Sequence, residues 1–128
     1  MKHDPLADMF YVIWNTEKVG HKSCIVPASE MIKNILMVMQ KHGFIGSFEF
    51  MEDGHGGKMC VELIGCINMA RAIKPRFAVQ KGAFEKWETR YLPAKGVGII
   101  ILSTPTGIMT HEEAKKQNIG GRLLGYVY

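Results

Sequence analysis

The sequence has few cysteines, and their spacing excludes the classes of small protein that depend on them. Cys24, Cys60 and Cys66 are an odd number of thiols at wide spacings, so neither a disulfide framework nor a paired zinc site is indicated. We interpret them as reduced thiols that serve as small hydrophobic residues. A metal site made of His55, Cys60 and Cys66 would match no standard ligand spacing, and we predict neither a metal nor a cofactor.

The sequence also lacks a long apolar run. No segment approaches the roughly 18 consecutive apolar residues of a membrane-spanning helix. The start, Met1-Lys2-His3-Asp4-Pro5, is not followed by the apolar segment of a signal peptide. We therefore expect a cytoplasmic protein without a membrane partner. With 47% hydrophobic and 22% charged residues, the 128-residue chain can form one ordinary core or two small adjoining ones.

The chain has a modest excess of positive charge. Sixteen Lys and Arg against twelve Asp and Glu give a formal net charge of +4. An excess of this sign favours an anionic partner such as a nucleic acid, although many basic enzymes carry as much. Charge therefore supports nucleic-acid binding without deciding it.

The first half of the chain is predicted to hold two capped amphipathic helices and three strands. Asp4 and Pro5 open a helix that runs to about Lys18. Ser29 caps a second helix that ends at Gly43, because glycine tolerates the left-handed conformation of a helix stop. Strands are expected at Ser23–Val26 and on both sides of a glycine-rich turn at 53–57. Apolar residues repeat at helical spacing in both helices: Leu6, Met9, Phe10 and Ile13, then Ile32, Ile35, Leu36 and Met39.

A second face of the first helix carries Tyr11, Trp14 and Lys18. Aromatic rings beside a basic residue can stack on bases and pair with phosphates of a nucleic acid. A second packing interface within the protein is the simpler explanation. The sequence leaves both interpretations open.

The second half of the chain begins with a cluster of basic residues. Arg71, Lys74 and Arg76 flank Pro75 within six positions, which predicts an edge strand or loop whose basic side chains point outward. These side chains either contact phosphate or are simply solvated. A short helix is then expected, with one face formed by Phe84, Trp87 and Tyr91 and its end at Leu92-Pro93.

The next stretch is the candidate functional segment. Ile99 to Leu102 form a buried strand, and a hydroxyl-rich loop begins near Ser103, because the following proline cannot donate to a strand ladder. Thr110 and Glu113 have the spacing of a capping box, which starts a short helix. A polar loop fixed between a rigid strand and a capped helix suits a polar or phosphate-bearing ligand, although an ordinary turn fits the composition equally well.

The chain ends in a last strand, Arg122 to Tyr128, which is apolar enough that it must be paired, and we expect its partner at Val97 to Leu102 or a neighbour. The whole pattern predicts an α+β fold of two small packed subdomains. The N-terminal subdomain, 1–70, has the order α-β-α-β-β. The C-terminal subdomain, 71–128, is mostly antiparallel β with short helices.

A Ser/His hydrolase is the competing class of function. Ser103, His111 and either Glu112 or Glu113 could act as nucleophile, base and orienting acid. The segment lacks the Gly-x-Ser-x-Gly turn of the hydrolases that place a nucleophile at a strand end, and His111 would lie at the first position of a helix. We therefore predict that the protein is not an enzyme.

Several ordered motifs run through the chain: Asp4-Pro-Leu-Ala-Asp, Val38-Met-Gln-Lys-His-Gly-Phe-Ile-Gly-Ser-Phe-Glu-Phe, Lys74-Pro-Arg-Phe, Glu85-Lys-Trp-Glu, Arg90-Tyr-Leu-Pro-Ala, Ser103-Thr-Pro-Thr-Gly-Ile-Met-Thr-His-Glu-Glu-Ala and Gly120-Gly-Arg-Leu-Leu-Gly-Tyr-Val-Tyr. Together they resemble the small-subunit ribosomal protein S8 family, in its archaeal and eukaryotic form. The resemblance covers essentially the whole chain.

This resemblance implies a structural, RNA-binding protein of the small ribosomal subunit. Members of the family bind an irregular helix in the central domain of small-subunit rRNA, help to assemble the platform beside neighbouring ribosomal proteins, and in some cases repress their own mRNA. In the family a Ser-Thr-x-x-Gly loop enters the RNA minor groove, which carries over here to Ser103, Thr104, Thr106 and Gly107. Many relatives have a hydroxyl residue where this chain has Pro105, so contact there must use its carbonyl group or van der Waals packing.

The first helix departs from the family pattern as well. Many bacterial relatives have Arg-Ile-Arg-Asn where this chain has Val12-Ile-Trp-Asn15. RNA contacts from this region are therefore carried over for Asn15, together with Lys18 and Lys22. A general RNA-binding or chaperone module without a ribosomal site is the alternative function.

Overall fold

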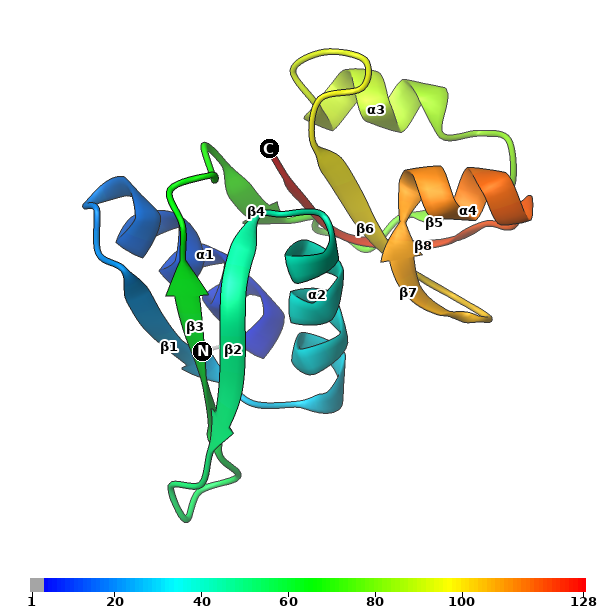
Figure 1. Cartoon of the computed structure of the whole chain (residues 1–128). Helices are drawn as coiled ribbons and strands as arrows, with labels where there is room; N and C mark the ends of the chain where they lie inside the picture. The colour runs from blue at the N-terminus through cyan, green and yellow to red at the C-terminus, as the bar shows by residue number, and fades with distance from the viewer. Residues whose placement is uncertain (1–3) are drawn as a thin grey trace.

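The computed structural model describes residues 4–128, which fold into two antiparallel sheets and four helices (Figure 1). The N-terminal part contains α1 (Pro5–Lys18), β1 (Ser23–Pro27), α2 (Glu30–Lys41), β2 (Ile45–Met51) and β3 (Lys58–Leu63). The C-terminal part contains β4 (Ala70–Ala72), β5 (Ala78–Val79), α3 (Glu85–Tyr91), β6 (Ile99–Thr104), β7 (Gly107–Thr110), α4 (His111–Gln117) and β8 (Gly121–Val127). The predicted α+β class is confirmed; the first three residues of the predicted subdomain 1–70 lie outside the described residues.

Both long helices begin where their capping residues predict. Asp4 Oδ1 accepts hydrogen bonds from the N–H groups of Leu6 and Ala7 at 3.1 and 3.3 Å, and Ser29 Oγ accepts one from Ile32 at 3.1 Å. The apolar stripes predicted on both helices are buried. They pack against the inner face of a three-stranded sheet with the strand order β1-β3-β2 (Figure 1).

The second sheet is built around β8. Its strand order is β4-β8-β6-β7, with β5 also paired to β8, so the predicted pairing of the last strand with β6 is confirmed. Gly125 of β8 lies directly under α1, because a Cβ atom at this position would be 2.5 Å from two ring atoms of Phe10. A glycine is needed there for α1 to rest on the second sheet.

The strand β6 is buried on both faces, as its aliphatic run predicts. Ile99 and Ile101 belong to a core cluster shared with α1 and α2, whereas Ile100 and Leu102 belong to a second cluster with Trp87 of α3. The change from the first sheet to the second, between β3 and β4, falls near the predicted boundary, but the first cluster spans it. The division into subdomains 1–70 and 71–128 stays a prediction.

The predicted loop from Ser103 to Gly107 has a different form in the structure. β6 continues to Thr104, and Gly107 begins β7, which pairs with β6 in the register Thr104↔Gly107. Pro105 and Thr106 form a two-residue turn, where the missing donor of proline costs no ladder hydrogen bond. Gly107 has φ of 126°, which residues with a side chain rarely adopt, and this lets the chain re-enter a strand at once. The segment is therefore a tight hairpin that leads into α4.

The three cysteines are free thiols in three different environments. Cys24 is buried, and burial raises the pKa of its thiol to about 11, so it acts as the small hydrophobic residue we predicted. Cys60 is half-buried. Cys66 is exposed, so the same interpretation is wrong for it. Within residues 4–128, no helix is long and apolar enough to cross a membrane.

Candidate nucleic-acid interface

The turn between β6 and β7, which we call the hairpin tip (residues 103–107), is held by its own hydroxyl groups. Thr104 Oγ1 donates to the carbonyl oxygen of Gly107 at 2.7 Å and accepts from the N–H of Thr106 at 3.3 Å. Thr106 Oγ1 donates to Gln117 Oε1 of α4 at 3.1 Å. Thr104 is only 9% exposed. Three hydroxyls of this segment are predicted to contact RNA, and those of Thr104 and Thr106 also stabilise the shape of the turn.

The outer surface of the hairpin tip is small and polar. Pro105, Thr106 and Gly107 are exposed, and Ser103 is half-buried with no side-chain hydrogen bond to any described residue. Ser103 pairs with Arg122 of β8, and the guanidinium of Arg122 is exposed. Arg122 could not be selected from the sequence, because only the strand pairing brings it to the tip.

A backbone contact fixes the neighbouring strand against the hairpin tip. A Cβ atom on Gly121, which precedes Arg122 in β8, would lie 2.2 Å from the carbonyl oxygen of Ser103. The two strands therefore approach more closely here than a side chain would allow. Gly121 therefore fixes the positions of Ser103 and Arg122 relative to each other.

The predicted capping box is confirmed on the helix side of the hairpin. Thr110 Oγ1 accepts from the N–H of Glu113 at 3.2 Å, and Glu113 Oε1 accepts from the N–H of Thr110 at 3.3 Å. Lys41 Nζ lies 3.0 Å from Glu113 Oε2, and His42 Nε2 lies 3.4 Å from Oε1. Burial alone would raise the pKa of Glu113, but hydrogen bonds from Lys41, Thr110 and His42 lower it to about 2. These contacts anchor the hairpin to α2.

A second group of predicted residues meets where α1 packs on β4. We call it the α1–β4 seam: Tyr11, Trp14 and Lys18 of α1, with Arg71 and Lys74. Lys18 Nζ lies 4.2 Å from the centroid of the Trp14 ring, and Arg71 Cζ lies 5.8 Å from it. Tyr11 is 64% exposed, whereas Trp14 is half-buried and packs against the core cluster, so this face of α1 is in part an internal packing interface and in part exposed.

The basic cluster of the second half is exposed, as predicted, but part of its charge is already paired. Lys74 Nζ lies 3.0 Å from Asp4 Oδ2, and Arg76 Nη2 lies 3.8 Å from Asp4 Oδ1. Burial would raise the pKa of Asp4, but the hydrogen bond from Lys74 and those from backbone N–H groups lower it overall. Arg71 makes no ion pair with a described residue, so it is the cation of this cluster that is free to contact a phosphate.

Contacts link the α1–β4 seam to the hairpin tip. Lys74 and Arg76 share the carboxylate of Asp4, and the guanidinium of Arg122 donates to the carbonyl oxygen of Arg76 at 3.3 Å. Arg122 in turn pairs with Ser103. The structure thus brings together cations from the loop after β4 and the start of β8.

Two predicted residues lie elsewhere. Asn15 faces β1, where it lines a surface hollow with Ser23 and Ile25, so it is not part of the α1–β4 seam. Lys22 lies between α1 and β1, and its carbonyl oxygen accepts from the N–H of Leu63 at 2.8 Å. Their contact with RNA stays a prediction, but any such contact would be separate from the seam.

The residues considered for a hydrolase do not form a catalytic arrangement. His111 is 2% exposed, its Nδ1 accepts from the N–H of Ile100 at 3.1 Å, and its Nε2 lies 3.0 Å from Glu88 Oε1. Both ring nitrogens are thus occupied, and neither contacts Ser103. Burial lowers the pKa of His111, which favours the neutral ring that these contacts require. His111 joins α4 to β6 and α3.

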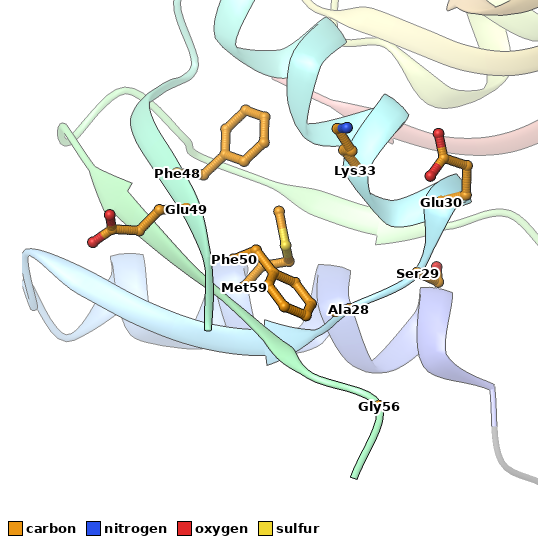
Figure 2. A pocket seen from close by; sticks show the side chains of 9 residues that line it. All are labelled: Ala28, Ser29, Glu30, Lys33, Phe48, Glu49, Phe50, Gly56 and Met59. Atoms are coloured by element: carbon orange, nitrogen blue, oxygen red, sulfur yellow. The ribbon is translucent and has the colours of Figure 1, made fainter. Parts of the chain in front are cut away.

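Another hollow, of about 470 Å³, lies between the start of α2 and the β2–β3 hairpin (Figure 2). Phe48 and Phe50 of β2 and Met59 of β3 form its apolar wall, and Glu30 and Lys33 stand on the α2 side. Phe50 is 55% exposed. None of the predicted RNA-binding residues lines this hollow, so it provides a useful control surface.

Comparison with known proteins gives one consistent result. Residues 4–128 match the family model described as ribosomal protein S8. The small ribosomal subunit protein uS8 of Methanococcoides burtonii is 52% identical over 126 residues, which cover 98% of this chain and 97% of that protein. The matched region includes both the hairpin tip and the α1–β4 seam.

Proposed function

The chain belongs to the ribosomal protein S8 family, a family of structural proteins of the small ribosomal subunit and not an enzyme class, and we propose that it binds the rRNA of that subunit directly. It binds an irregular helix in the central domain of this rRNA and helps to assemble the platform. Neighbouring small-subunit proteins are its other partners, and its own mRNA is a second RNA target. The observation that carries the proposal is a chain of contacts through Lys74, Arg76 and Arg122, which joins the exposed cations of the α1–β4 seam to the hairpin tip.

The hairpin tip suits the minor groove of A-form RNA. That groove is wide and shallow and displays 2′-hydroxyls and base edges, so it accepts short polar groups better than long side chains. Ser103 supplies a hydroxyl that bonds to no described residue, and the Thr106 hydroxyl can still accept a hydrogen bond while it donates to Gln117. Gly107 has no side chain to keep the backbone away from the RNA. Because Thr104 is committed to holding the turn, the tip meets the groove as a fixed shape.

The α1–β4 seam supplies the charge. Lys18 and Arg71 are exposed and form no ion pair with a described residue, so both are free to neutralise phosphates. Lys74 and Arg76 share the carboxylate of Asp4, and their contribution is correspondingly smaller. Phosphate contacts of this kind position a protein on RNA but do not read sequence.

Hydroxyl-radical footprinting of the pure protein on complete small-subunit rRNA tests the proposal. We expect protection confined to one irregular helix of the central domain and strongest at the sugars that border the minor groove where the hairpin tip enters. The Phe50→Ala variant is the control, because this exposed ring lies in the hollow of Figure 2 and should leave the footprint unchanged.

Two other results would contradict the proposal. Weak protection spread over all domains of the rRNA would indicate a general RNA-binding or chaperone module. Protection confined to a helix outside the central domain would show that the assigned binding site is wrong.

A further inference from the structure

A hollow of about 400 Å³ opens on the α1–β4 seam, and both aromatic and basic side chains line it. Its volume is within the roughly 300–1,000 Å³ of sites that hold small organic molecules. Tyr11 and Trp14 of α1 line it, together with Arg71 of β4 and Lys74 of the following loop. The remaining lining residues are mostly small: Ala7, Asp8, Phe10, Ala70 and Ala72.

The two aromatic side chains have different freedom. Trp14 is half-buried, and its indole Nε1 donates to the carbonyl oxygen of Asn68 at 3.1 Å, which fixes the orientation of its ring. Tyr11, one turn earlier on α1, is 64% exposed. The hollow therefore has one fixed aromatic wall and one ring that is free to close on a planar group.

The charges around the hollow favour an anion beside that planar group. Arg71 and Lys18 are both within cation–π distance of Trp14 and make no ion pair with a described residue. Lys74 is paired to Asp4, and Asp8 is the one carboxylate among the lining residues. The cations outnumber this carboxylate, so a phosphate on either side of a bound base would be neutralised.

We infer that this hollow holds one unpaired nucleotide of the bound RNA, with its base against Tyr11 and Trp14 and its phosphates at Arg71 and Lys18. A paired base in a helix keeps its faces stacked on its neighbours, whereas an unpaired base can be turned out onto an aromatic side chain. This inference rests on the proposed function, because it assigns one part of the same RNA to one hollow.

Tryptophan emission provides the direct test. Trp87 packs on Phe77 at a centroid distance of 4.9 Å and is 7% exposed, so Trp87→Phe is a conservative change that leaves Trp14 as the only tryptophan. The probes are the rRNA fragment that the protein protects and versions of it in which each unpaired nucleotide is deleted in turn. We expect the complete fragment to quench Trp14 emission, and one deletion to abolish the quenching while the protein stays bound.

Affinity of ring variants provides the second readout. Tyr11→Ala removes an exposed ring that the fold does not need, and we expect it to weaken binding of the complete fragment about tenfold, the usual loss for one stacked base. The same variant should bind the deletion fragment as well as the parent protein does. Tyr11→Phe should retain the parent affinity, and Phe50→Ala, the matched exposed ring outside the seam, should have no effect.

Each contrary result is distinct. Binding of the fragment with unchanged Trp14 emission would overturn the inference and leave the proposed function intact. Quenching that survives every deletion would show that paired RNA covers the hollow. Quenching by other small-subunit proteins and not by RNA would make the hollow a protein contact. Failure of the parent protein to bind any rRNA fragment would overturn the proposed function itself.

Discussion

The hairpin tip and the α1–β4 seam are both exposed and polar, but they use their polar groups in opposite ways. At the tip, the hydroxyls of Thr104 and Thr106 are bonded within the protein, and strand pairing places the cation of Arg122 beside Ser103. In the seam, Lys18 and Arg71 lie over the Trp14 ring and form no ion pair with a residue that the structure describes. A rigid shape and unpaired positive charges are therefore presented by different parts of one small protein.

The largest effect should follow from Gly121→Ala, which damages the tip and spares the seam. The new Cβ would lie 2.2 Å from the backbone oxygen of Ser103, and backbone cannot move aside as a side chain can. We expect a loss of about 1–3 kcal/mol in the free energy of unfolding, measured by urea denaturation. Gly46→Ala is the control, because its Cβ would meet only the flexible carboxyl end of Glu62. Equal stability of the two variants would show that β6 and β8 are not fixed as described.

The next largest effect should follow from changes at Ser103 and Thr104 of the tip. The side chain of Thr104 forms hydrogen bonds within the turn, and that of Ser103 forms none with a described residue. Exchange of Ser103 and Thr104 together for alanine should weaken rRNA binding by about 1–2 kcal/mol, measured by filter binding at one salt concentration. The single changes separate two causes. Thr104→Ala should also lower the free energy of unfolding, because it leaves the N–H of Thr106 without its acceptor, whereas Ser103→Ala should affect binding alone. Unchanged binding by the double variant would remove the tip from the RNA interface.

A smaller effect is expected from single charges in the seam. Arg71→Gln should weaken binding a few-fold at about 0.15 M salt, because one phosphate contact is lost in a partly screened environment. Lys33→Gln removes a lysine beside the hollow of Figure 2 and should leave affinity unchanged. If both variants weaken binding equally, only the net charge of the protein matters, and the seam is not a distinct surface.

The smallest effect is a pH dependence that arises from Glu113, on the helix side of the hairpin. The pKa of Glu113 in the folded protein is about 2, below its ordinary value of 4.5, so its contribution to stability is present above about pH 4.5 and is lost as the pH falls toward 2. Glu113→Gln keeps the capping box but removes the charge. Its unfolding free energy should therefore depend less on pH over this range than that of the parent. Identical pH profiles would show that the pairs with Lys41 and His42 contribute nothing.

Local signals in the sequence were sufficient for much of the fold. The caps at Asp4, Ser29 and Thr110 each satisfy backbone donors within a few residues, so they can be predicted from adjacent letters. The strand β7 could not be predicted in this way. Its four residues form a strand because they pair with β6, and this pairing depends on the tertiary structure and not on the local sequence.

The candidate site shows the same limit. Ser103, Thr106 and Gly107 could be selected from one short segment, but the commitment of Thr104 to the turn becomes visible only with the hairpin geometry. Arg122 reaches the tip through strand pairing, and Arg71 meets Trp14 across 57 positions of sequence. The residue types of the candidate site can be selected from the sequence, but which of them are neighbours depends on the tertiary structure.

The salt dependence of rRNA affinity tests the division between shape and charge most directly. A plot of the logarithm of the binding constant against the logarithm of salt concentration compares the parent, the Ser103/Thr104 double alanine variant and a Lys18/Arg71 double glutamine variant. We expect the tip variant to give a line parallel to that of the parent at lower affinity. The seam variant should have a slope shallower by about 1 for each lost phosphate contact. Equal changes of slope in both variants would show that shape and charge are not divided between the hairpin tip and the seam.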